Sequence, residues 1–127
     1  YREFLLKYNG GIPKNTFYPS LKGDPSDGLI VSNFHGFIKG CGDNLLREYQ
    51  YVGIRYPSNT LPIGDDVGGN RILLSVKGPD RGKVYFWDHE MECAEGEIPD
   101  YSNLTLIADS FEEFIDGLKD ESEIVSE

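Results

Sequence analysis

Two short apolar runs joined by a turn constrain the fold of this chain most. Ile72–Val76 and Val84–Asp88 each carry apolar side chains at both odd and even positions, and successive side chains of a strand point to opposite faces of a sheet. The connection Lys77–Lys83 contains the glycine and proline residues that suit a turn. The pattern therefore predicts a central β-hairpin covered on both faces, by a helix on one side and by aromatic packing on the other.

Other segments predict further strands. β-forming residues predict a short edge strand over Thr16–Tyr18 and a longer strand over Leu29–Ile38. Leu104–Ala108 is a candidate for another strand or for an extended lead-in to the segment that follows it. Together with the hairpin, these runs predict an antiparallel or mixed sheet of about four to six strands.

Two helical segments are predicted before the hairpin. Tyr1–Gly11 has apolar residues at helical spacing and ends in an Asn-Gly-Gly run, which predicts the last turns of a helix. Asn44–Tyr51 has the composition of a short helix or loop. We expect this second segment to pack on the sheet through Leu45, Leu46 and Tyr49.

The clearest helix signal lies near the C-terminus. Ser110–Glu113 matches a capping box, in which the serine and the glutamate bind each other's backbone N–H groups. The apolar residues that follow recur at helical spacing, and they are Phe111, Phe114, Ile115 and Leu118. The helices and the sheet predict an α+β fold in one domain over residues 1–127, because a chain of this length can bury a single core.

The charge of the chain narrows the class of partner. Acidic residues outnumber basic ones by 22 to 12, which gives a formal net charge of −10. This charge argues against nucleic acid and against an anionic membrane, because both bind cationic surfaces. Eight acids lie in the helix and tail over residues 109–127, where Lys119 is the only base. This acidic end either steers a basic partner or is a solvated face that maintains solubility.

Signals for secretion, membrane insertion and cofactor binding are absent from the sequence. It contains two cysteines, Cys41 and Cys93, and no apolar run of the roughly 20 residues that a membrane helix needs. We therefore expect a reduced, cytoplasmic protein. The sequence has no phosphate-binding loop, no dinucleotide fingerprint and no Gly-x-Ser-x-Gly motif. It predicts no cofactor and no catalytic residue.

An acidic, glycine-rich segment, Gly64–Asn70, precedes the first strand of the hairpin. It is interpreted as a tight turn whose Asp and Asn side chains bind nearby backbone and whose glycines accept positive φ. The alternative is a weak divalent-cation site formed by Asp65, Asp66 and Asn70. The spacing departs from that of a calcium loop at most ligand positions.

A histidine flanked by acids, His89, follows the second strand of the hairpin. Asp88 and Glu90 are expected to present polar groups with it at the strand end. His89 and Cys93 have the spacing of zinc ligands on a helix, but the second histidine of a His-Glu-x-x-His motif is absent. His35 lies in a strand-like run and is interpreted as an edge or core residue rather than a base.

Four motifs in order resemble the SUKH superfamily, in its Smi/Knr-like branch. They are Tyr1–Pro13, Leu61–Asn70, Gly82–Glu90 and Ala108–Phe114, and together they span nearly the whole chain. The resemblance implies an α+β fold, with an antiparallel sheet that carries helices, and a non-enzymatic role. Members usually have a helix and a Leu-Pro segment ahead of the Tyr1 region, and the sequence contains neither.

The resemblance also implies a kind of partner. Bacterial domains of this superfamily are implicated as immunity proteins that bind and neutralise toxins, often nucleases, whereas fungal relatives regulate cell-wall synthesis. A toxin that acts on nucleic acid has a basic face, so the acidic charge predicts a basic toxin domain as the protein partner, without indicating an oligomeric state.

The alternatives are a regulatory interaction module of the cell-wall type and a metal-assisted hydrolase. The hydrolase hypothesis uses Asp65, Asp66, Asp88 and His89. The predicted partner-binding residues are the polar groups of the two central motifs and the acids of the terminal helix: Asp65, Asp66, Asn70, Asp88, His89, Glu90, Glu112, Glu113 and Asp116.

Overall fold

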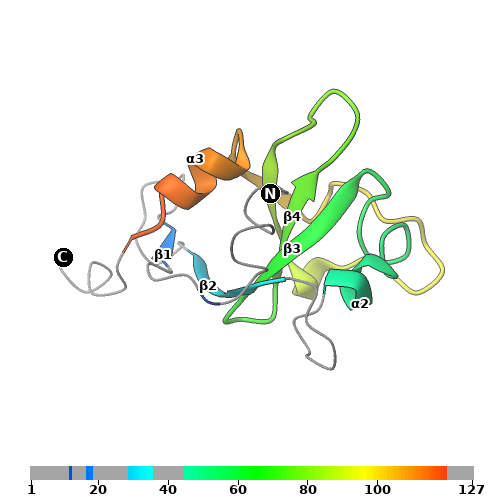
Figure 1. Ribbon diagram of the computed structural model, residues 1–127. Coiled ribbons are helices and arrows are strands. Elements are labelled where there is room, and N and C mark those ends of the chain that lie inside the picture. Colours follow the sequence, from blue (N-terminus) through cyan, green and yellow to red (C-terminus); the bar gives the residue numbers. More distant parts are fainter. Residues whose placement is uncertain (1–11, 13–16, 19–28, 36–44, 120–127) are drawn as a thin grey trace.

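A six-stranded antiparallel sheet dominates the computed structural model, which describes residues 12, 17–18, 29–35 and 45–119 (Figure 1). The strands are β1 (Phe17–Tyr18), β2 (Leu29–Phe34), β3 (Thr60–Asp66), β4 (Arg71–Ser75), β5 (Val84–Trp87) and β6 (Leu104–Ala108). Their order in the sheet is their order in the chain, so each strand pairs with its sequence neighbour. The helical elements are α2 (Leu45–Tyr49), the 3-10 turn η2 (His89–Met91) and α3 (Phe111–Asp116).

The predicted central hairpin is confirmed. β4 pairs with β5 in a register that places Ile72 opposite Phe86 and Leu73 opposite Tyr85. The connection turns through Gly78 and Gly82, whose φ angles of 93° and 94° are readily adopted only by glycine. The edge strand β1 and the strand β6 are also confirmed, and β2 begins at the predicted residue and extends to Phe34.

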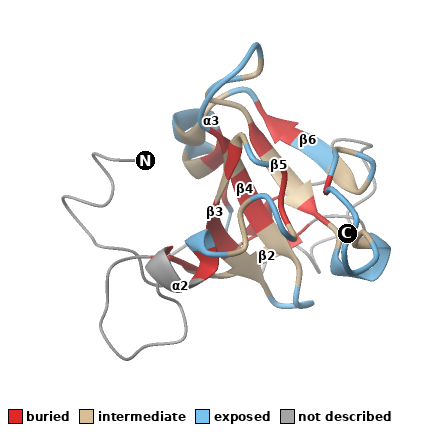
Figure 2. Cartoon of the chain, turned by 90° about the vertical axis from the view of Figure 1, so that its right-hand side faces the viewer, coloured by how far each residue is buried: buried red, intermediate tan, exposed pale blue. Residues whose placement is uncertain are grey.

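Apolar groups are buried on both faces of the hairpin, as its sequence predicts. Ile72 and Val84 belong to a core cluster that includes Phe114 of α3, whereas Leu73 and Trp87 form a second cluster with Tyr56. Figure 2 shows buried residues running through β3, β4 and β5. Trp87 is fully buried, and burial of a large apolar side chain contributes about 2–3 kcal/mol. Both faces of the sheet are therefore packed, and the cluster under α3 is the larger of the two.

The terminal helix is confirmed, and it is shorter than its apolar pattern suggests. Ser110 caps it, since its Oγ accepts a hydrogen bond from the Glu113 N–H at 3.0 Å. The Glu113 carboxylate accepts from the N–H of Asp109 rather than from that of Ser110, so the capping box is shifted by one residue. The helix ends at Asp116, and Leu118 is buried beyond its end, next to a bridge between Phe17 and Lys119.

Helices contribute less than an α+β fold suggests. α2 has five residues and α3 has six, so the sheet supplies most of the regular structure in the ranges described. Leu45 is buried as predicted, but the prediction for Tyr49 is wrong, because its side chain is 59% exposed. Glu48, one residue earlier, faces the sheet instead and binds Tyr56 and Arg71 there.

Several predictions fall on parts of the chain outside the described residues. They are the helix over Tyr1–Gly11, the surroundings of Cys41, residues 36–38 of the strand predicted over Leu29–Ile38, the side chain of Leu46 and the acidic tail beyond Lys119. Within the described ranges, no helix has the length and apolar character needed to cross a membrane.

Candidate functional site

The turn between β3 and β4 is held by the carboxylate of Asp66. Its Oδ1 accepts hydrogen bonds from the backbone N–H groups of Gly68 and Asn70, both at 2.9 Å. Gly69 has a φ of 87°, a conformation that L side chains rarely adopt. The turn interpretation is confirmed for residues 67–70, with Asp66 bonding the backbone and Gly69 at positive φ. It is wrong for Gly64–Asp66, which form the end of the unpredicted strand β3, and neither Gly64 nor Gly68 has positive φ.

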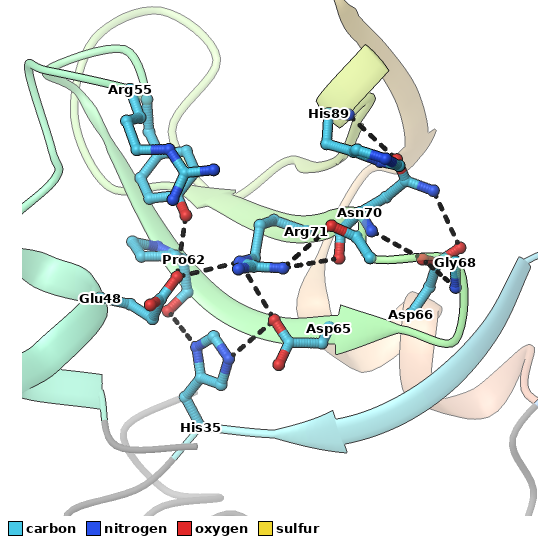
Figure 3. A network of polar contacts seen from close by, with 12 residues as sticks. His35, Glu48, Arg55, Pro62, Asp65, Asp66, Gly68, Asn70, Arg71 and His89 are labelled. Carbon is cyan, nitrogen blue, oxygen red and sulfur yellow. Dashed lines mark hydrogen bonds and ion pairs between the residues drawn. The ribbon is translucent and has the colours of Figure 1, made fainter. Parts of the chain in front are cut away.

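Asn70 joins this turn to the segment that follows β5 (Figure 3). Its Oδ1 accepts from the backbone N–H of His89 at 3.0 Å and lies 2.6 Å from His89 Nδ1, which fits the tautomer with a proton on Nδ1. Asp88 caps η2 by accepting from the Glu90 N–H at 3.0 Å. The structure thus brings the residues of the two predicted motifs together, and His89 and Glu90 are exposed at their junction.

Asp65 belongs to a different environment from its neighbour Asp66. Its Oδ1 lies 3.1 Å from Nε2 of His35 and 3.2 Å from Nε of Arg71. His35 is fully buried and its Nδ1 lies 3.1 Å from the carbonyl oxygen of Pro62, which confirms it as a core histidine. Adjacent residues of a strand point apart, so the two carboxylates do not form a pair.

A partly buried ionic network lies beside Asp65, and the sequence did not predict it. Arg71 Nε donates to Glu48 Oε1 at 2.9 Å, and the Tyr56 hydroxyl donates to the same oxygen at 2.8 Å. Arg71 also donates to the carbonyl oxygen of Gly69 at 3.0 Å, so it supports the turn from its other side. Arg71 in an otherwise apolar strand could have indicated this network in the sequence, because a buried charge needs a partner of opposite charge.

The protonation states of this network follow from its charges. Burial alone lowers the pKa of Arg71, but the carboxylates of Asp65 and Glu48 and the nearby Tyr56 outweigh it and the pKa is raised. Burial and then the adjacent Glu48 raise the pKa of Tyr56. Arg71 therefore remains a cation and Tyr56 remains a hydrogen-bond donor at neutral pH.

The predicted acids of α3 lie on another part of the molecule. α3 packs over the core cluster that contains Ile72 and Val84, whereas Arg71 shares its sheet face with Trp87. Figure 1 shows α3 and α2 at different ends of the sheet. Glu112, Glu113 and Asp116 are exposed there. The nine predicted residues therefore divide into three sets. The turn group is Asp66, Asn70, Asp88, His89 and Glu90, and the α3 group is Glu112, Glu113 and Asp116. Asp65 belongs to neither, because it contacts His35 and Arg71.

A second polar cluster, centred on Asp80, locks the tip of the central hairpin. Its carboxylate accepts from the hydroxyl groups of Ser75 at 2.7 Å, Tyr85 at 2.9 Å and Tyr101 at 2.7 Å. Burial opposes ionisation of Asp80, but these donors outweigh it and lower its pKa. Burial and the hydrogen bond to Asp80 raise the pKa of Tyr85 to about 12. The cluster stabilises the loop, because every group in it already has a partner.

The aspartate carboxylates of the turn group are held by the protein's own backbone. The carboxylates of Asp66 and Asp88 already accept backbone hydrogen bonds, and Asp65 is turned away from them toward His35 and Arg71. In the part of the chain that the structure describes, no three His, Cys, Asp or Glu side chains are grouped to hold a metal ion. What the group offers is a set of fixed polar atoms at the surface.

The chain matches a protein family and a curated protein. The family model described as the SMI1 / KNR4 family (SUKH-1) matches residues 1–117. The chain is also similar to the "SPbeta prophage-derived uncharacterized protein YokK" of Bacillus subtilis (strain 168), with 33% identity over 136 residues. This match covers 95% of the chain and 66% of the relative, so the chain spans slightly less than two thirds of the relative's length. No solved structure matches the chain.

Proposed function

Because this chain belongs to the SMI1/KNR4 family (SUKH-1), we propose that it is a non-enzymatic protein-binding domain of the immunity type. Its partner is a toxin domain with a basic face, such as a nuclease, and binding neutralises the toxin by covering that face. The proposal includes a single α+β domain that works inside the cell.

The distribution of charge is the observation that carries the proposal. Residues 84–118 contain ten acids and no lysine or arginine, while the rest of the chain contains twelve acids and twelve bases. The formal net charge of −10 therefore arises in this one stretch. It runs through β5, η2, β6 and α3, and β6 is an edge strand of the described sheet. The acids of this stretch can attract a cationic protein, while the rest of the chain has no formal net charge.

Two groups of residues have different roles in this proposal. Glu112, Glu113 and Asp116 on α3 are exposed, so they add to the long-range attraction that speeds encounter. The turn group, which includes Asn70, His89 and Glu90, is held by short hydrogen bonds. It contributes polar contacts that are already ordered before the partner arrives, which lowers the entropic cost of binding.

The proposal predicts a toxin gene beside the gene for this chain, and binding kinetics with a catalytically inactive form of that toxin domain test it. The association rate is expected to fall about tenfold or more between low and high ionic strength, because screening weakens electrostatic steering. Glu112→Lys should lower the rate further at low salt. Lys77→Gln, which removes an exposed base outside the acidic stretch, is the matched control. An association rate that is independent of salt would contradict the steering.

The family match leaves a second protein-binding role to be distinguished. Fungal relatives of the superfamily regulate cell-wall synthesis, so an interaction module for an endogenous partner is the alternative. Protection of cells that express the neighbouring toxin supports immunity, and a lack of protection supports the regulatory role. A third candidate, a metal-assisted hydrolase, needs stoichiometric binding of a divalent metal, and flat calorimetric titrations with calcium, magnesium, manganese and zinc would remove it.

A further inference from the structure

Three apolar side chains are exposed on two loops at the edge of the Trp87 cluster. Ile54 is 64% exposed, Met91 is 68% exposed and Ile98 is 89% exposed. Single exposed apolar residues are ordinary in proteins, whereas a group of them at one place marks an interaction site. The question is therefore whether these three lie together.

Contacts between the two loops bring them together. Arg55 donates two hydrogen bonds to the Glu92 carboxylate, from Nε at 2.9 Å and from a terminal nitrogen at 3.2 Å. The Cys93 sulfur lies 4.0 Å from the carbonyl oxygen of Ile54 and 3.8 Å from that of Glu97. These contacts hold the loop of Ile54 against the loop that carries Met91 and Ile98. The exposed part of the two loops is named here the Ile54–Met91–Ile98 surface.

This surface stands on a rigid aromatic base. The guanidinium of Arg55 lies over the rings of Tyr51, Tyr56 and Trp87, at 5.4, 5.7 and 5.3 Å from their centroids. Tyr56 and Trp87 are fully buried and contact each other edge to face. Cation–π contacts and a two-pronged ion pair fix the orientation of Arg55. The loops are thus ordered without a partner, which reduces the entropy lost on docking.

Acidic residues alternate with Met91 and Ile98 along their loop. Glu90, Glu95, Glu97 and Asp100 are exposed on the same loop as Met91 and Ile98, and Arg55 is already neutralised by Glu92. An apolar centre with a charged rim is the usual arrangement of a protein interface. The rim here is negative, so the complementary surface carries lysine and arginine around an apolar core. A second copy of this acidic chain would be repelled.

We propose that the Ile54–Met91–Ile98 surface is the docking centre for a basic protein partner, which inserts apolar side chains between these residues and places lysine or arginine side chains on the rim. The proposal rests on the function proposed above, and it assigns the affinity to residues outside the motifs of the family resemblance. Ile54, Met91 and Ile98 supply the buried contact area, and the acids set the rate and the register.

The first experiment measures affinity for the inactive neighbouring toxin domain with Met91→Ser/Ile98→Ser, Ile54→Ser and the control Val76→Ser. Val76 is also exposed, at 41%, but lies just past β4. We expect the affinity to fall about 30-fold or more in the double variant, as for interface hot spots, and to stay unchanged in the control. Trp87 fluorescence should give the same urea midpoint for all four proteins. If the toxin binds the double variant as tightly as the parent, the docking centre is wrong while the immunity function stands.

The second experiment applies if the toxin domain does not bind the parent protein, which removes the proposed function instead. A synthetic amphipathic helical peptide, with leucine on one face and lysine on the other, is then titrated and followed by NMR. Shifts confined to residues 51–56 and 88–100, lost in Met91→Ser/Ile98→Ser and absent with a serine-for-leucine peptide, support the docking centre. Shifts elsewhere overturn it. A concentration-dependent dimer that the double variant abolishes would also overturn it, in favour of a second copy.

Discussion

Replacing Arg71 with methionine should destabilise the fold, because it leaves partly buried carboxylates without their cation. Arg71 lies between Glu48 at 2.9 Å and Asp65 at 3.2 Å, and its side chain is only 20% exposed. Removal leaves the Glu48 carboxylate, itself 10% exposed, without its cation. Breaking a fully buried pair costs about 3–5 kcal/mol, and breaking an exposed one costs up to about 1 kcal/mol. For this partly buried network we expect a loss of about 2–3 kcal/mol in the free energy of unfolding.

Urea unfolding followed by tryptophan fluorescence measures this loss directly. Trp87 is the single tryptophan of the chain and is fully buried, so its emission reports the packed state. With a slope of about 1.5 kcal/mol per molar urea, the expected loss lowers the midpoint by about 1.3–2 M. A loss under about 1 kcal/mol would show that water compensates Glu48 and Asp65, and would refute the reasoning from burial.

Two further variants isolate the cause. Glu48→Gln keeps the shape of the side chain and removes its charge, so the double-mutant cycle with Arg71→Met should give a coupling energy of about 1–3 kcal/mol. Arg55→Met breaks an ion pair that is 30% and 28% exposed at its two side chains, and should cost only about 1 kcal/mol. Equal costs for the two arginines would mean that burial does not distinguish the pairs.

Three other perturbations test separate parts of the fold. Burial and Asp80 raise the pKa of Tyr85 to about 12. The Tyr85 hydroxyl therefore contributes fully to stability below the ordinary tyrosine pKa near 10, and this contribution is lost as the pH rises through 12. The difference in the free energy of unfolding between the parent and Tyr85→Phe, measured by urea unfolding, should disappear between these pH values. Ser110→Ala removes the cap of α3 and should lower the free energy of unfolding by about 1 kcal/mol; an unchanged midpoint would mean that the cap is not formed in solution. Gly64→Ala places a methyl group 2.8 Å from the carbonyl oxygen of Asn33 and should lower the free energy of unfolding by about 1–3 kcal/mol. In Gly53→Ala the added methyl group meets no atom within 4 Å, so this variant shows the effect of backbone strain at a φ of 86° without a steric contact.

The sequence by itself determined the local structure of the fold. The hairpin of β4 and β5 is readable because two apolar faces alternate within a few residues, and their covering by α3 and by aromatic rings follows from the need to bury both. The cap at Ser110 and the turn at Asp66 are also local, since each bond spans two to four residues. Family membership is equally a property of the ordered motifs.

The polar residues that meet were revealed by the folded chain alone. Arg71 pairs with Glu48 across 23 positions, His35 with Asp65 across 30, and Arg55 with Glu92 across 37. No periodicity encodes such pairs, because they depend on the register of strands and on how loops cross.

The dependence on strand register and loop position also explains the predictions that the structure corrected. Asp65 and Asp66 are adjacent in sequence but contact different partners because a strand alternates its side chains. Tyr49 is exposed, whereas Glu48, one residue earlier in α2, is buried against Arg71 of β4. Patterns of neighbouring residues fix the elements, whereas the surface that a partner would meet is assembled from residues that only the folded chain brings together.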